Sequence, residues 1–211
     1  MTRTKTLWLG IALIYGAFFG WYTSFSGPIT AEEQARYMDY FKQGRYGDDP
    51  VFLERMQRFM ADDTGDDFVM INVIDLYDTP MQVDGVQPGE SSSEVLDKYM
   101  AYMTPSLIAR ASHPVLYGTA AANAMDLMNA DGMEQWTTGA GMRYRSRRDM
   151  LEISTNPEFG AAHIFKIAAM EKTIAFPIDP WFHLGDPRLL LALILSLIGC
   201  AFSWRWASTK V

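Results

Sequence analysis

Residues Met142–Asp179, "MRYRSRRDMLEISTNPEFGAAHIFKIAAMEKTIAFPID", contain the pattern that decides the fold. Arg143 and Arg145 alternate with methionine and tyrosine, as side chains do on the two faces of a β-strand. Ser146 and Asp149 have the spacing of a helix capping box, which predicts a helix directly after this strand. The β-branched and aromatic residues near the end of the stretch are typical of another strand. The stretch therefore predicts the order strand, helix, strand.

The preceding residues predict a similar unit. Asp67–Asp78, "DFVMINVIDLYD", is rich in β-branched residues and is predicted to be a buried strand. Ser92 is predicted to cap a helix over "SEVLDKYMAYMTPSLIARAS", which Pro105 is expected to kink or restart. Two further strands are predicted over "PVLYGTAA" and "EQWTTGAGMRYRS". The resulting order β-α-β-β-α-β over residues 67–180 indicates an α+β domain.

Residues 28–66 are predicted to form a helical lead-in to this domain. Thr30 and Glu33 have capping-box spacing at the start of one helix. Asp49 followed by Pro50 is typical of the start of the next, because proline fits the first helical position.

Both ends of the chain carry long apolar runs. They are "LWLGIALIYGAFFGWYTSFSG" over residues 7–27 and "LLLALILSLIGCAFSWRW" over residues 189–206. Each approaches the roughly 20 apolar residues that a helix needs to cross a bilayer. We therefore predict a transmembrane anchor over 1–27 and a transmembrane helix with a short tail over 181–211.

A cleaved signal peptide is the alternative for the first run, because Arg3 and Lys5 precede it. The residues before Gly27 are a poor match to a cleavage site, which favours an uncleaved anchor. A buried core helix is the other alternative, but two such apolar helices at opposite ends of the chain would need a large core.

Charge is distributed unevenly along the chain, whose formal net charge is −7. Every acidic residue lies between Glu32 and Asp186, whereas cations flank both apolar runs: Arg3, Lys5, Arg205 and Lys210. The positive-inside rule then predicts a bacterial inner-membrane protein with both termini in the cytoplasm and a periplasmic central domain. An acidic central domain also argues against binding to nucleic acid, which requires a basic face.

Small residues recur at four-residue intervals in both apolar runs. They are Ala12, Gly16 and Gly20 in the first run, and Ala192, Ser196 and Cys200 in the second. Small side chains at this spacing let helix backbones approach closely in lipid. We therefore predict helix–helix packing in the membrane, within the chain or with neighbouring chains.

The central segments resemble the ferredoxin-like dimeric α/β-barrel superfamily, and more narrowly a bacterial branch of small domains of unknown function. The resemblance rests on "ERMQRFMADDTGDDFVMINVIDLYD", "SSEVLDKYMAYMTPSLIARASHPVLYG" and the opening stretch, including its "TNPEF" step and the alanine-rich helix that carries His163. It implies that two domains pair through their sheets to close a barrel. The transmembrane helix expected at each end departs from the usual soluble form.

Some members of this superfamily use the cleft between sheet and helices for cofactor-free oxidation of aromatic compounds or for haem degradation. The residues that would line such a cleft here are Tyr99, His113, Tyr117, Trp136, Arg143, Arg145 and His163. They form no recognisable catalytic constellation, and His113 and His163 also suit structural roles at a strand start and on a helix face. With three scattered histidines and one cysteine, we expect no metal and no cofactor.

Methionine pairs offer one alternative to that expectation, because an extracytoplasmic methionine stripe can bind Cu(I). The pairs that would share a helix face are Met56/Met60, Met100/Met103 and Met125/Met128. Ordinary core packing uses the same spacing, and methionine is an adaptable core residue.

Arg147 and Arg148 lie in the first turn of the predicted helix, where the helix dipole disfavours cations. Nearby carboxylates such as Asp149 and Glu152 are one explanation, because they would neutralise the two side chains. The other is an exposed basic patch that docks an acidic partner or anionic lipid headgroups.

These observations favour a non-catalytic accessory or scaffolding subunit of an inner-membrane complex, either homodimeric or bound to a larger partner. The alternative is a membrane-tethered cofactor-free oxygenase or small-ligand-binding protein that acts on an aromatic or lipophilic compound. A pocket of about 300 Å³ or more with converging polar groups would favour the alternative. A cleft filled by side chains would favour the scaffold.

Overall fold

The computed structural model describes residues 2–180, 183 and 185–209. Parts of both predicted terminal segments, residues 1, 181–182, 184 and 210–211, lie outside the described residues. The chain forms two compact units, which we describe separately: Phe25–Asp179, and Met1–Ser24 together with Pro180–Val211.

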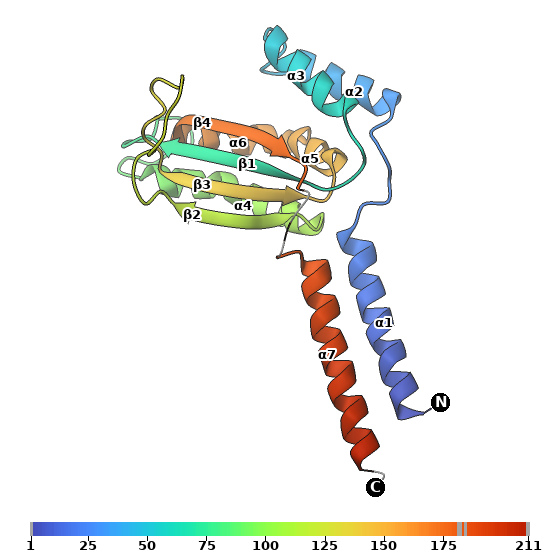
Figure 1. Ribbon diagram of the computed structural model, residues 1–211. Helices are drawn as coiled ribbons and strands as arrows, with labels where there is room; N and C mark the ends of the chain where they lie inside the picture. Colours follow the sequence, from blue (N-terminus) through green and yellow to red (C-terminus); the bar gives the residue numbers. More distant parts are fainter. Residues whose placement is uncertain (1, 181–182, 184, 210–211) are drawn as a thin grey trace. The chain divides into compact units, whose positions relative to one another are not determined.

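The larger unit contains a four-stranded antiparallel sheet with the order β2-β3-β1-β4 (Figure 1). Its elements are α2 (Ala31–Gln43), α3 (Pro50–Ala61), β1 (Phe68–Leu76), α4 (Ser92–Ala109), β2 (His113–Thr119), β3 (Thr138–Tyr144), α5 (Arg147–Ser154), α6 (Pro157–Ala169) and β4 (Met170–Ile178). The order β-α-β-β-α-β in such a sheet is the ferredoxin-like topology. The predicted α+β class and ferredoxin-like order are therefore confirmed.

Most helix starts follow the local sequence signals. The capping box of Thr30 and Glu33 is formed at α2, and Ser146 accepts a hydrogen bond from the Asp149 amide at α5. The cap of α4 is Ser91 rather than the predicted Ser92. Ser91 is three residues before Glu94, and the two residues form the reciprocal hydrogen bonds of a capping box.

Pro105 lies inside a continuous α4 and does not restart it. The proline is exposed, so the carbonyl that its missing N–H leaves free can be hydrated. The predicted second helix instead divides into α5 and α6 at Asn156, whose side chain caps α6 with Pro157 at the first helical position. β4 begins directly after α6, because Met170, the C-cap of that helix, already has an extended backbone.

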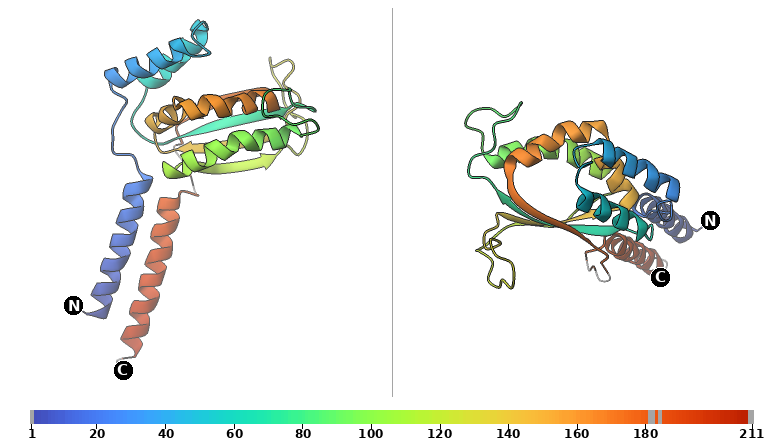
Figure 2. Two further views of the ribbon diagram at one scale, coloured as in Figure 1. Left: turned by 180° about the vertical axis from the view of Figure 1, so that it is seen from behind. Right: turned by 90° about the horizontal axis from the view of Figure 1, so that it is seen from above.

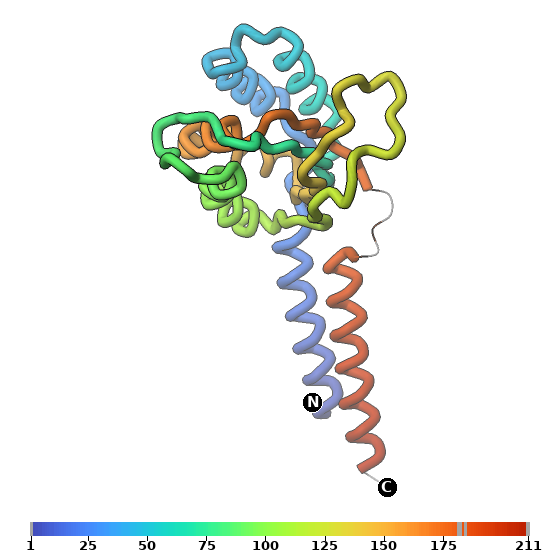
Figure 3. The backbone as a smooth tube through the Cα atoms, turned by 90° about the vertical axis from the view of Figure 1, so that its left-hand side faces the viewer, coloured from blue at the N-terminus to red at the C-terminus, as the bar shows by residue number. Residues whose placement is uncertain are grey.

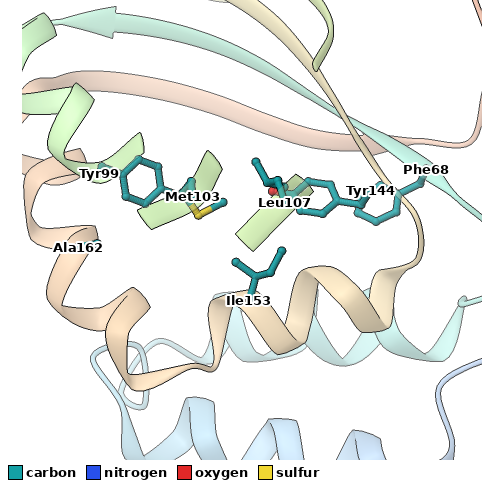
Figure 4. Packing of buried hydrophobic residues seen from close by; sticks show 7 residues of the cluster. All are labelled: Phe68, Tyr99, Met103, Leu107, Tyr144, Ile153 and Ala162. Atoms are coloured by element: carbon teal, nitrogen blue, oxygen red, sulfur yellow. The ribbon is translucent and has the colours of Figure 1, made fainter. Parts of the chain in front are cut away.

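Helices α4 and α6 cover one face of the sheet. The two helices lie behind the strands in Figure 1 and in front of them in the left view of Figure 2. Phe68 of β1 and Tyr144 of β3 are register partners on this face, and their rings stack with centroids 5.3 Å apart. Met103, Leu107 and Ile153 pack against them to form the core (Figure 4).

The opposite face of the sheet carries apolar side chains that no described element of this unit covers. Alternation along β1 places Ile71 on this face, and its register partner on β4 is Phe176. Exposed fractions there are high for apolar residues: Leu116 66%, Phe176 46%, Ile174 40% and Ile178 39%. We call these four residues and Ile71 the open sheet face.

The smaller unit is an antiparallel pair of helices, α1 (Arg3–Tyr22) and α7 (Pro187–Ser208), with the two chain ends at the same end of the pair (Figure 3). Among the described helices, α7 is the one long and apolar enough to cross a membrane, a criterion of length and composition alone. α1 includes the charged Arg3 and Lys5 and ends at Tyr22, so its apolar part falls short of about 20 residues. The two-span prediction is therefore supported only at the C-terminal end.

Candidate functional site

The arginines of the opening stretch are all in contact with carboxylates or backbone carbonyls of the larger unit. Arg143 is 2% exposed, and its guanidinium donates to Asp67 at 2.7 Å and to the Ala111 carbonyl at 2.7 Å. Arg145 makes two bonds to Asp149, at 2.7 and 2.9 Å. Arg143 therefore ties β3 to the residues that precede β1 and β2, whereas Arg145 ties the end of β3 to α5. Strand alternation puts Arg143 on the face opposite the core residue Tyr144, and so away from the predicted cleft.

Arg147 and Arg148 connect α5 to parts of the chain far away in the sequence. Arg147 is buried, donates to the Phe59 carbonyl at 2.7 Å, and lies 3.5 Å from Asp179 and 3.8 Å from Asp63. Carboxylates therefore do neutralise the two arginines, but they come from distant parts of the chain. The suggested Asp149 and Glu152 pair with Arg145 and Arg110 instead. Docking of an external partner by these two arginines stays a prediction.

Arg148 holds the start of the helical lead-in. It makes two bonds to Glu33, at 2.8 and 3.0 Å, and donates to the carbonyls of Gly27 at 3.1 Å and Pro28 at 2.9 Å. Bonding to Arg148 is the main reason why the pKa of the Glu33 carboxyl falls from 4.5 to about 2. The ion pair therefore fixes α2 and the residues before it against α5.

Of the seven residues predicted for the cleft, the structure brings together Tyr99 and His163. Their ring centroids are 6.1 Å apart, and Phe159 stacks on His163 at 4.9 Å. The remaining predicted residues lie elsewhere: Tyr117 is 72% exposed, Trp136 donates to the Met133 carbonyl in the long loop before β3, and His113 bonds to the Pro114 carbonyl at the start of β2. The predicted set therefore does not form one site.

Lys166 completes the group around Tyr99 and was missed in the sequence. Its ammonium lies 5.9 Å from the centre of the Tyr99 ring, one helical turn from His163. Burial lowers the pKa of Lys166. Burial, Lys166 and Arg45 together lower the pKa of His163 to about 4, so this imidazole is neutral at neutral pH. The spacing of three residues on a helix is the signal that links His163 to Lys166.

A cavity of about 250 Å³ lies beside this group, between α6 and the start of β4. Its lining includes His163, Lys166, Ile167, Met170, Glu171 and Tyr46. Between the sheet and the helices, Phe68, Met103, Leu107 and Tyr144 pack together with Tyr99 in one buried cluster. The cavity is smaller than the roughly 300 Å³ or more that is typical of drug-sized ligand sites.

The small residues predicted to pack in the membrane have different surroundings within the smaller unit. Ala12, Ala192 and Ser196 line a cavity of about 160 Å³ between α1 and α7. A side chain added at Gly16 or Gly20 would meet open space, and Cys200 is exposed.

Gly199 of α7 lies in close contact with α1, a contact that was not predicted. A Cβ atom there would lie 2.7 Å from the Trp8 ring and 2.9 Å from Ile11. The indole N–H of Trp8 also donates to the Ser203 hydroxyl at 3.2 Å. A bulky aromatic ring therefore lies over a glycine, which is a contact that spacing alone did not reveal.

The methionines of the proposed copper pairs have ordinary packing roles where they are buried. Met60 and Met103 belong to separate core clusters, whereas Met125 is 97% exposed in the loop between β2 and β3. Among the described residues, no three histidine, cysteine or acidic side chains gather where they would hold a metal ion.

The fold defines an α+β protein of ferredoxin-like topology. The chain is similar to the solved structure of RPA0582, a protein of unknown function from Rhodopseudomonas palustris, with a TM-score of 0.50 and 20% identity over 62% of this chain and 94% of that one. A methylated form of RPA0582 gives a TM-score of 0.52 and 20% identity over 63% and 93%. These likenesses concern the fold alone.

A weaker likeness is to SnoaB, a cofactor-independent oxygenase from Streptomyces nogalater. The TM-score is 0.33 and the identity 11%, over 57% of this chain and 99% of that one. A likeness at this level bears on neither the fold nor the function of this chain. No family model matches the chain, and no curated protein is similar enough in sequence to count as a relative.

Proposed function

We propose that this protein is a non-catalytic scaffolding or accessory subunit of a bacterial inner-membrane complex, and that its ferredoxin-like domain pairs with a second copy through the open sheet face. The observation that carries the proposal is the row of exposed apolar side chains on β2 and β4, Leu116, Ile174, Phe176 and Ile178. Contiguous exposed apolar surface on a soluble domain marks an interaction site.

The second copy is the occupant that the geometry favours. The face is apolar along its centre, and its buried charges are already neutralised. Arg143 pairs with Asp67, and Asp75 lies 3.7 Å from the Lys172 ammonium and accepts a hydrogen bond from the Thr137 hydroxyl. An identical face therefore brings no unpaired charge into the contact. Pairing of two such faces is also the arrangement that the superfamily resemblance implies.

Attachment to the membrane rests on α7, with α1 packed antiparallel beside it. In the proposed topology both tails are cytoplasmic and the larger unit is periplasmic, because cations flank the apolar runs and acidic residues lie between them. Reporter fusions at either end of the chain and within the loop near Val86 test this arrangement. A periplasmic C-terminus would contradict it.

The pairing is tested by Phe176→Glu in the full chain, purified in a mild non-ionic detergent. A charge at the centre of an apolar contact should abolish the dimer measured by light scattering or analytical ultracentrifugation. Ile108→Glu is the matched control, because Ile108 is 57% exposed on α4, away from the sheet face. A dimer that survives Phe176→Glu, or that is lost equally in the control, would contradict the proposal.

The oxygenase alternative has less support in the geometry. Buried side chains of the core pack between sheet and helices, and the cavity at the β4 edge is smaller than typical ligand sites. Turnover of an aromatic substrate by the purified protein would favour this alternative instead.

A further inference from the structure

The ammonium of Lys166 has no anionic partner in the part of the chain that the structure describes. No ion pair or hydrogen bond joins it there, and its ammonium lies over the Tyr99 ring, 5.9 Å from the ring centre. The side chain is half-buried on α6. Removing a cation from water without a compensating charge is costly, so such groups are usually paired.

The missing partner cannot come from the neighbouring imidazole. Phe159 and Tyr99 enclose His163 on two sides, and its pKa of about 4 leaves it neutral at neutral pH. Arg45, the other charged group that influences His163, is also a cation. The charged groups that act on His163 are therefore both cations, Lys166 and Arg45, and neither can balance the other.

The cavity that Lys166 lines has space for the missing anion. Of the two charged residues that β4 adds to its wall, Lys172 is engaged elsewhere, because its ammonium donates to the Gly132 carbonyl at 2.8 Å. Glu171 is exposed and forms no ion pair within the described residues, so it places a negative charge at the rim. Ile167 and Met170 provide apolar walls.

We propose that this cavity binds a small organic carboxylate, with Lys166 as its counter-ion and the apolar walls in contact with its hydrocarbon body. The volume of about 250 Å³ limits the ligand to a compact molecule. Neutral His163 can offer one ring nitrogen as a hydrogen-bond partner to the carboxylate. This site is separate from the open sheet face and does not depend on the proposed scaffolding function.

Benzoate is the probe, and benzamide, which has the same shape without the charge, is its matched control. Binding to the full chain in non-ionic detergent is measured by calorimetry and by the change in thermal midpoint. Benzoate should bind and benzamide should bind at least about tenfold more weakly, because a bond to a charged group is lost. Equal binding of the two compounds, or no binding of benzoate at millimolar concentration, would overturn the proposal.

Three variants locate the site. Lys166→Met should weaken benzoate binding at least about tenfold, whereas Lys42→Met, the same change at an exposed position on α2, should leave it unchanged. Glu171→Gln should strengthen binding, because it removes a like charge from the rim. A Lys166→Met protein that retains its thermal midpoint and binds benzoate as the wild type does would refute the assignment, and so would weaker binding in Glu171→Gln.

Discussion

Replacing Arg148 with methionine should loosen the helical lead-in from the rest of the larger unit. The change removes two bonds to Glu33 and two to the carbonyls of Gly27 and Pro28. A pKa of about 2 instead of 4.5 for Glu33 corresponds to about 3 kcal/mol at roughly 1.4 kcal/mol per unit. Because Glu33 is partly exposed, solvent screening reduces the expected coupling with Arg148 to about 1–2 kcal/mol.

The pH dependence of this term has a definite sign. A carboxyl whose pKa is lowered by folding stabilises the folded state above its unfolded pKa, here near 4.5, and this stabilisation is lost as the pH falls toward 2. The wild type should therefore lose stability over this window. Arg148→Met and Glu33→Gln should both flatten the dependence.

A double-mutant cycle of Arg148→Met and Glu33→Gln measures the coupling from urea unfolding of the full chain, with hydrogen exchange of α2 amides as a local probe. The matched control is the exposed pair of Arg58 and Glu54 on α3, with side chains 72% and 68% exposed, which should contribute less than about 0.5 kcal/mol. A coupling for Arg148 and Glu33 no larger than that of the control would refute the reasoning.

Two further predictions concern other parts of the chain. Gly199→Leu should force Trp8 out of its contact and separate α1 from α7. The yield of a disulfide between cysteines introduced at Ala12 and Ser196 should then fall, whereas Gly16→Leu should leave this yield unchanged. Equal yields in both variants would contradict the assigned contact face. His163 should titrate near pH 4 by NMR in the folded protein. Because the unfolded state binds this proton at a higher pH, the free energy of unfolding should fall as the pH is lowered from about 6.5 to 4. His163→Gln should reduce this fall. An imidazole that titrates near 6.5 in the folded protein would contradict its burial.

The features that the sequence predicts well are those determined by neighbouring residues. The capping box at Thr30 and the helix cap at Ser146 depend on residues three positions apart, and the alternation at Arg143 depends on the strand period of two. The succession β-α-β-β-α-β is likewise read from local patterns along the chain, and the structure has the same succession.

The features that the sequence does not predict depend on distant residues. The partners of Arg147 lie at Asp63 and Asp179, and nothing local distinguishes these carboxylates from other acidic residues of the chain. The helix packing residues illustrate the same limit. Gly16 of α1 and Gly199 of α7 are equally small, and only the rotation of each helix about its axis decides which of them meets side chains of the facing helix.

The two adjacent arginines at the start of α5 also have a mechanical consequence. Arg148 holds the chain at Gly27 and Pro28, where it enters the larger unit, and Arg147 contacts Asp179, where the chain leaves it. Tension applied through either connection therefore reaches a guanidinium before it reaches a strand of the sheet. One helical turn therefore holds both connections of the larger unit, and a pull on either of them would be resisted by a guanidinium of α5 as well as by the sheet.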